Sequence, residues 1–273
     1  ASYLQNSSVS IELIPSSGGT ANLDWLAGRL GEDVSAVVVQ SPNRLGVIES
    51  WKEVGKLCSD HPTLFIAVGD PLAFGLLAPP GECGADVYAG EGQVLGSPVS
   101  FGGPYLGLLA SRMEYVRKIP GRLVGATRDV EGRPGFVLAL QTREQHIRRE
   151  RATSNICTNQ GLVALRAAIY LALMGRQGYK DVADLCFQKS HYAAREIARI
   201  PGYSLPFGET FFKEFVVTCP VPSETIVREG VNKGIFPGTP LKDDPRFLRI
   251  AVTENSTRED MDRLVAFLRE FGP

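Results

Sequence analysis

The sequence predicts an α/β fold in which a mostly parallel sheet is flanked by helices and is followed by a small α+β domain. Two observations carry this prediction. Short apolar, β-branched runs, such as residues 36–39 and 64–68, alternate with segments whose apolar side chains have helical spacing. A turn rich in Gly, Pro, Ser or Asn follows these runs, and open α/β sheets bind their ligands at such strand ends.

Length and composition limit the possible classes of protein. The 273 residues suffice for one large α/β unit or for two domains. The net charge of -1 gives no electrostatic reason to expect a nucleic acid or an anionic membrane as partner. Five widely spaced cysteines without a CxxC pair indicate reduced thiols in a cytoplasmic compartment, and the three scattered histidines suggest no metal site. No apolar run is long enough to span a bilayer.

The first part of the chain alternates between strands and helices. Residues 35–40 are almost continuously apolar, which predicts a strand buried on both faces of the sheet. Gly69-Asp70-Pro71 ends the next buried strand. The expected elements, in order, are a strand at 9–14, a helix at 22–30, a strand at 35–40, a helix at 47–57, and strands at 64–68 and 85–88.

The stretch 84–107 is dense in glycine, and its apolar side chains are short or interrupted. Such a composition predicts a loop shaped by its backbone beside a ligand or a partner, and a plain surface connection remains the alternative. Neither a phosphate loop nor a dinucleotide-binding fingerprint is present. If this loop holds a cofactor, it does so by another chemistry.

The second part of the chain predicts a hairpin, a broken helix and the small domain. A strand is expected at 106–110, and the turn at 130–135 predicts a hairpin. The helix 161–174 should end at the glycines of 175–178, and a second helix should follow at 180–197. The small domain should contain strands at 211–218 and 247–252, a helix at 223–233, and a final helix with a capping box at Ser256-Thr257-Arg258-Glu259-Asp260. We therefore expect domains at 1–176 and 177–273.

Several strings occur in one characteristic order: residues 38–43 (VVQSPN), 79–86 (PPGECGAD), 90–93 (GEGQ), 101–104 (FGGP), 120–124 (PGRLV), 140–145 (LQTREQ) and 154–159 (SNICTN). With them the chain resembles fold-type I pyridoxal-phosphate enzymes. More narrowly, it resembles the alpha subunits (subunit 1) of the two-subunit glycine dehydrogenase (decarboxylating), the P-protein of the glycine cleavage system. Those subunits are longer, so the resemblance implies a carboxy-terminal fragment with an incomplete sheet domain.

The resemblance also implies a division of labour between subunits. Members of the family remove the carboxylate of glycine with pyridoxal phosphate and pass an aminomethyl group to the lipoyl arm of the H-protein. The cofactor lysine of the family corresponds here to Gln93, which follows Gly92. Because an amide cannot form a Schiff base, the cofactor is expected on the lysine-bearing subunit 2, and this chain alone should be inactive. Lys56, Lys118 and Lys180 are expected to be solvated.

The resemblance places two further groups of residues near a cofactor. Thr158 and Asn159, at the start of a long helix, are expected to bind the phosphate of the partner's cofactor, and an unliganded helix cap is the alternative. Asn43 and Asp70 stand at strand ends where this fold places a residue near the pyridoxal hydroxyl and an acid for the ring nitrogen. With Gln93 in place of the lysine, Asn43, Asp70 and Gln93 are expected to line a vestigial pocket. A third group, Arg143, Arg148, Arg149 and Arg151, either frames the entrance for an acidic carrier protein or forms a solvated basic face.

The function expected from the sequence is thus that of the lysine-free subunit of a bacterial or archaeal glycine decarboxylase, an oxidoreductase active only as a complex. Two alternatives stay open. One is a stand-alone, aminotransferase-like pyridoxal-phosphate enzyme with its lysine elsewhere. The other is a non-catalytic scaffold that binds the H-protein without touching the cofactor.

Overall fold

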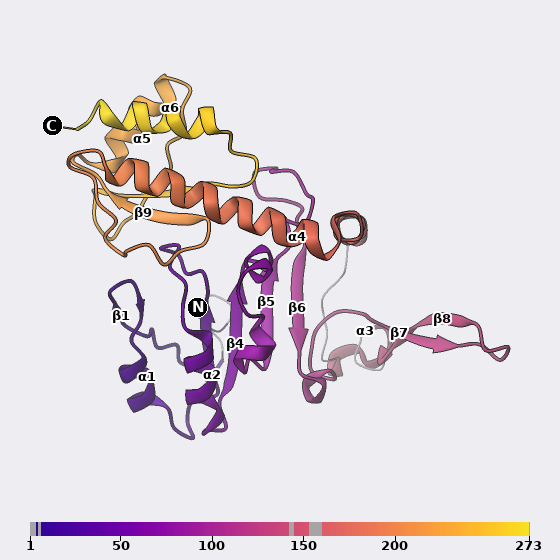
Figure 1. Cartoon of the computed structure of the whole chain (residues 1–273). Helices are drawn as coiled ribbons and strands as arrows, with labels where there is room; N and C mark the ends of the chain where they lie inside the picture. Colours follow the sequence, from indigo (N-terminus) through magenta and orange to yellow (C-terminus); the bar gives the residue numbers. More distant parts are fainter. Residues whose placement is uncertain (1–3, 5–6, 142–144, 153–159, 273) are drawn as a thin grey trace.

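A mostly parallel sheet forms the centre of the first part of the chain (Figure 1). The computed structural model describes residues 4, 7–141, 145–152 and 160–272. The strand order is β3-β4-β5-β6, in which the first three strands are parallel and the fourth is antiparallel. The strands are β3 (Ala36–Gln40), β4 (Leu64–Gly69), β5 (Val87–Glu91) and β6 (Gly107–Ser111). The predicted fold class is confirmed.

Helices α1 (Leu23–Arg29) and α2 (Trp51–Ser59) cover one face of this sheet. Val37 and Val39 are buried against them, whereas Val38 is 58% exposed on the opposite face. The prediction that this strand is buried on both faces is wrong for the described residues, because they cover only one face of β3. Apolar composition alone does not reveal which face a neighbour covers.

One predicted strand and one predicted helix boundary are also wrong. Residues 9–14 form no strand, because no described strand pairs with them, and Leu13 is 85% exposed. The only pairing nearby is the short ribbon of β1 (Ser16–Ser17) and β2 (Thr20–Ala21). Val47 forms a bridge with Phe211, so α2 begins only at Trp51.

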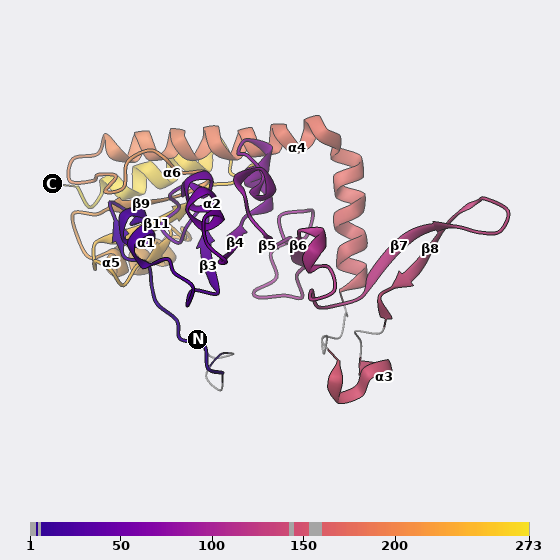
Figure 2. The same cartoon turned by 90° about the horizontal axis from the view of Figure 1, so that it is seen from below.

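Helix α4 (Gly161–Ala198) consists of two arms that meet at Gly175, as Figure 2 shows. Gly175 has φ 61° and ψ -176°, a conformation that is essentially restricted to glycine. The predicted break is therefore confirmed, although the second arm resumes at once rather than at residue 180. That arm packs on the 3-10 helix η2 (Pro71–Gly75), and together with Phe212 they form one buried cluster. Because this cluster combines residues from both predicted domains, the boundary after residue 176 stays a prediction.

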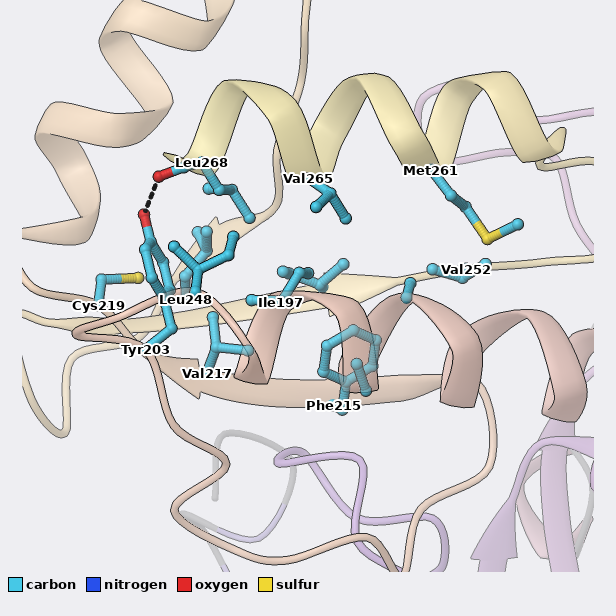
Figure 3. Packing of buried hydrophobic residues seen from close by; sticks show 14 of the residues in the cluster. Ile197, Tyr203, Phe215, Val217, Cys219, Leu248, Val252, Met261, Val265 and Leu268 are labelled. Carbon is cyan, nitrogen blue, oxygen red and sulfur yellow. Dashed lines mark hydrogen bonds between the residues drawn. The ribbon is translucent and has the colours of Figure 1, made fainter. Parts of the chain in front are cut away.

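The small α+β domain is present as predicted. Its sheet has the order β10-β11-β9, and its core lies between this sheet, α6 and the second arm of α4 (Figure 3). The hydroxyl of Tyr203 donates to the carbonyl of Leu268 at 3.0 Å and ties the end of α6 to this core. The elements are β9 (Glu214–Thr218), α5 (Ser223–Asn232), β10 (Thr239–Pro240), β11 (Phe247–Ala251) and α6 (Arg258–Arg269).

The predicted hairpin, β7 (Leu123–Arg128) and β8 (Pro134–Ala139), is confirmed and projects away from the sheet (Figures 1 and 2). Short helical segments complete the described chain: η3 (Pro80–Cys83), η4 (Met113–Tyr115), α3 (Gln145–Arg148) and η6 (Arg149–Arg151). No helix in the described ranges has the length and apolarity to cross a membrane. Among the described residues, four cysteines are free thiols: Cys58, Cys83, Cys186 and Cys219. The same residues contain no cluster of metal-binding side chains.

Candidate cofactor pocket

A cavity of ≈ 190 Å³ lies at the carboxyl ends of β3 and β4, between the sheet and the small domain. The sheet contributes Asn43, just after β3, and Asp70, just after β4. The small domain contributes two cations and a carboxylate: Lys213, Arg249 and Glu214. The cavity therefore occupies the sheet edge at which this class of fold binds ligands, and its polar side chains come from two distant parts of the sequence.

Asn43 uses its whole amide to build the turn after β3. Its Oδ1 accepts from the backbone N–H groups of Leu45 (2.9 Å) and Val47 (3.2 Å). Its Nδ2 donates to the carbonyl of Gly19 (2.8 Å) and to Oε1 of Glu49 (2.7 Å). Two amide hydrogens and two lone pairs are all that an asparagine side chain offers. In this structure Asn43 shapes the wall of the cavity and has no hydrogen left to donate to a ligand.

Asp70 is likewise engaged through both carboxylate oxygens. Oδ1 accepts from the backbone N–H of Leu72 at 3.0 Å and caps η2, and Oδ2 forms an ion pair with Nζ of Lys213. The Asp70 side chain is 20% exposed and that of Lys213 is 12% exposed. Water therefore screens this ion pair much less than one on the surface.

Two half-buried tyrosines stand near Asp70 without donating to it. The hydroxyl of Tyr88 donates to the carbonyl of Gly69 at 3.0 Å, and that of Tyr179 donates to the carbonyl of Pro71. Burial, followed by the charge of Asp70, raises the pKa of Tyr179 to about 12 and raises that of Tyr88 as well. Both phenols therefore stay neutral at physiological pH and add no negative charge beside Asp70, and the cation at this carboxylate is Lys213.

The sequence reasoning missed Lys213. It considered Lys56, Lys118 and Lys180, all of which are exposed in the structure, as expected. The missed signal was the position of Lys213, directly after two phenylalanines and two residues before a third, in a strand-like run. A lysine placed there has its stem enclosed, and its ammonium group then needs a buried partner.

Gln93 follows β5, the strand that pairs with β4, and it does not line the cavity. Its Nε2 donates to the carbonyl of Ser97 at 2.6 Å, and its backbone N–H donates to Oε1 of Glu91 at 2.9 Å. The side chain is thus turned onto its own loop. The structure brings Asn43 and Asp70 to one cavity and leaves Gln93 outside it.

Thr158, Asn159 and Arg143 lie outside the described residues. The first described residue of that region, Gln160, is the N-cap of α4 and makes no side-chain capping bond. The remaining arginines of the predicted basic group, Arg148, Arg149 and Arg151, are exposed.

Pyridoxal phosphate as a covalently held cofactor does not fit the residues at this edge of the sheet. A Schiff base requires an amine, and the position after β5 carries the amide of Gln93. The cofactor's ring nitrogen requires a free acid, and Asp70 is already paired with Lys213. At this edge of the sheet position 93 therefore offers no amine, and Asp70 and Lys213 are already paired with each other.

The sheet order, the polar strand ends and the adjoining small domain together define the fold of the fold-type I pyridoxal-phosphate enzymes. A solved NifS-like protein has this fold, with a TM-score of 0.69 at 15% identity over 98% of this chain and 70% of its own. At that identity the likeness shows the fold alone.

The family follows from closer matches. The profile of the glycine cleavage system P-protein matches residues 3–268, and this chain belongs to that family. The probable glycine dehydrogenase (decarboxylating) subunit 1 of Chlorobium limicola is 51% identical over 251 residues, which are 92% of this chain and 57% of that protein. The crystal structure of a glycine decarboxylase (P-protein) in inhibitor-bound form matches with a TM-score of 0.93 and 40% identity, over 99% of this chain and 61% of that one. The family resemblance is confirmed, and the chain spans about three-fifths of these relatives.

Proposed function

We propose that this chain forms part of the lysine-free subunit of a two-subunit glycine decarboxylase, whose other subunit carries pyridoxal phosphate. The observation that carries the proposal is Gln93, an amide at the lysine position of a P-protein chain, with its Nε2 bonded to the carbonyl of Ser97. The name subunit 1, given to the relative from Chlorobium limicola, supports a second subunit.

In this proposal the decarboxylation of glycine takes place on the partner subunit. Pyridoxal phosphate supplies the electron sink there, and the aminomethyl group passes to the lipoyl arm of the H-protein. Thr158 and Asn159, three and two residues before the start of α4 at Gly161, contribute to the phosphate site of the partner. This chain completes and supports an active site whose cofactor is bound covalently by the other subunit.

Exposed apolar side chains support association with another protein. Leu162, on the first arm of α4, is 83% exposed, and Phe136 of β8 is 78% exposed. Others lie on the same two elements: Leu165, Ile169, Leu171, Leu173, Val137 and Leu138. So much exposed apolar surface is typical of a protein that buries it against a partner.

The test is covalent trapping of the cofactor. The chain is incubated with pyridoxal phosphate, reduced with borohydride and weighed by intact mass spectrometry, alone and together with the lysine-bearing subunit. We expect a pyridoxyl adduct on the partner and none on this chain, because Gln93 has no amine. A stoichiometric adduct on this chain contradicts the proposal and favours a stand-alone enzyme.

A second measurement separates a contributing subunit from a scaffold. Thr158→Ala should weaken the affinity of the assembled enzyme for pyridoxal phosphate by about tenfold, the value of one charge-assisted hydrogen bond. Thr158→Ser, which keeps the hydroxyl, should retain that affinity. An unchanged affinity in Thr158→Ala favours the scaffold.

A further inference from the structure

We infer that Lys213 acts as a built-in counter-ion that takes the place of the cofactor's ring nitrogen at Asp70, so that this pocket excludes pyridoxal phosphate independently of Gln93. The inference rests on the proposed function, because it takes Asp70 as the acid expected at the cofactor site of a subunit that has lost its lysine. Lys213 is thus a second obstacle to cofactor binding, in addition to the amide of Gln93. Restoring the missing lysine would then not restore cofactor binding.

Both oxygens of the Asp70 carboxylate are already engaged. Oδ1 caps the N–H of Leu72 and Oδ2 faces Nζ of Lys213. A protonated ring nitrogen would need the oxygen that Lys213 occupies. With the two side chains only 20% and 12% exposed, displacing the ammonium group would leave it poorly solvated and without a carboxylate partner. The ion pair and the cofactor are therefore mutually exclusive at this carboxylate.

Hydrogen bonds hold the backbone of the segment that carries Lys213 in place. The carbonyl of Lys213 accepts from the N–H of Val252 at 2.9 Å. The carbonyl of Phe212 accepts from Oγ of Ser190 at 2.8 Å, and the Phe212 side chain is fully buried. These ties to the small domain and to α4 hold the lysine beside the end of β4. Lys213 therefore cannot leave the pocket by a simple movement of its backbone.

Other ion pairs near the same cleft are more exposed than the pair of Lys213 and Asp70. Arg44 pairs with Asp243 and Arg249 pairs with Glu214, but these four side chains are between 32% and 60% exposed. Such pairs are screened by water and contribute little. The pair of Lys213 and Asp70 is the one that is enclosed. The burial of this pair follows from its place at the end of β4 and not from a general requirement for ion pairs between the two domains.

The test compares four forms of the chain: the unchanged protein, Gln93→Lys, Lys213→Met, and the double variant. The probe is pyridoxal phosphate, and the readout is the fraction of chain carrying a borohydride-stable adduct, with the labelled residue located by peptide mass mapping. Lys213→Met keeps the apolar stem and removes the charge. We expect Gln93→Lys alone to remain near the background of the unchanged chain. The double variant should be labelled at position 93 with about tenfold higher apparent affinity.

Three further variants serve as controls. In the Gln93→Lys background, Lys213→Arg keeps a cation at Asp70 and should keep the cofactor out, whereas Lys180→Met removes an exposed lysine and should change nothing. Adding Asp70→Asn to the double variant should abolish the gain, because the acid that receives the ring nitrogen is then absent. Far-UV circular dichroism and the thermal midpoint establish that each variant is folded.

A non-covalent measurement covers the case in which Lys213→Met folds poorly together with Gln93→Lys. Binding of 4-deoxypyridoxine 5′-phosphate, which needs no lysine, should be about tenfold tighter to the single variant Lys213→Met than to the unchanged chain. Equal binding to both forms contradicts the inference.

Two outcomes of the trapping experiment would overturn it as well: full labelling of Gln93→Lys alone, or no labelling of the double variant. Labelling of Lys213 in the unchanged chain would contradict the inference and the proposed function together. The two are otherwise separable, since an adduct on the partner subunit tests only the proposed function.

Discussion

At the scale of single residues, the contact between the sheet and the small domain depends on Gly46. This residue has φ +84°, and a Cβ built on it would lie 1.9 Å from the carbonyl oxygen of Glu214. Its neighbour Val47 forms the bridge with Phe211, and the amide of Asn43 fixes the turn. The same approach brings Glu214, and with it Lys213, to the ends of β3 and β4. Gly46 is thus a structural requirement for the closed pocket.

Gly46→Ala should destabilise the chain by about 2–5 kcal/mol, because it combines left-handed strain with a clash against backbone that cannot move aside. The matched control is Gly18→Ala, which has a similar φ of +60° and nothing within 4 Å of its Cβ. That control should lose only about 1–2 kcal/mol. Urea unfolding measures both, and equal losses in the two variants would contradict the close packing at Gly46.

At the scale of secondary structure, the elements that the sequence predicted best are those with local signals. The glycine of α4 and the capping box of α6 are both read from neighbouring residues. Oγ1 of Thr257 accepts from the N–H of Asp260 at 3.1 Å, and Oδ2 of Asp260 accepts from the N–H of Thr257 at 3.0 Å. The strand predicted at 9–14 fails because pairing, unlike capping, needs a partner from elsewhere.

Thr257→Ala should destabilise the small domain by about 1 kcal/mol, because α6 loses its N-cap and the N–H of Asp260 loses its acceptor. Thr257→Ser keeps the hydroxyl and should restore most of that loss. The thermal midpoint of the chain reports both changes. If Thr257→Ser were as destabilised as the alanine variant, the methyl group rather than the cap would be the stabilising feature.

At the scale of the whole molecule, three buried clusters each contain a free thiol. Cys58 is on the buried face of α2, Cys186 lies where α4 meets η2, and Cys219 lies in the small domain. Burial raises the pKa of the Cys58 thiol to about 11 and the pKa values of Cys186 and Cys219 to about 12, with a hydrogen bond to Glu254 contributing at Cys186. Because an unfolded thiol has a pKa of about 8.5, unfolding favours ionisation above that pH.

The free energy of unfolding should therefore be unaffected by these thiols below about pH 8 and should fall as the pH rises toward 11. Each thiol contributes a slope of about 1.4 kcal/mol per pH unit within that window. Urea unfolding at pH 8, 9 and 10 measures the slope. Cys219→Ala should make it shallower by the contribution of one thiol, whatever its effect on absolute stability. An unchanged slope would mean that Cys219 ionises as easily in the folded chain as in the unfolded one.

The sequence by itself determined the alternation of strands and helices, the break of α4, the cap of α6 and the family, because each depends on local periodicity, on neighbouring residues or on strings in a fixed order. It also located Asn43 and Asp70 at strand ends, where the structure places them on one cavity.

Only the tertiary structure decided what those residues do there. Lys213 reaches Asp70 from a segment 143 positions later in the chain. The amide of Asn43 is fully engaged in hydrogen bonds to Gly19, to Glu49 and within its own turn. Which face of β3 is covered depends in the same way on distant residues. Ion pairing and burial are set by distance in space, and no local pattern in the sequence encodes that distance.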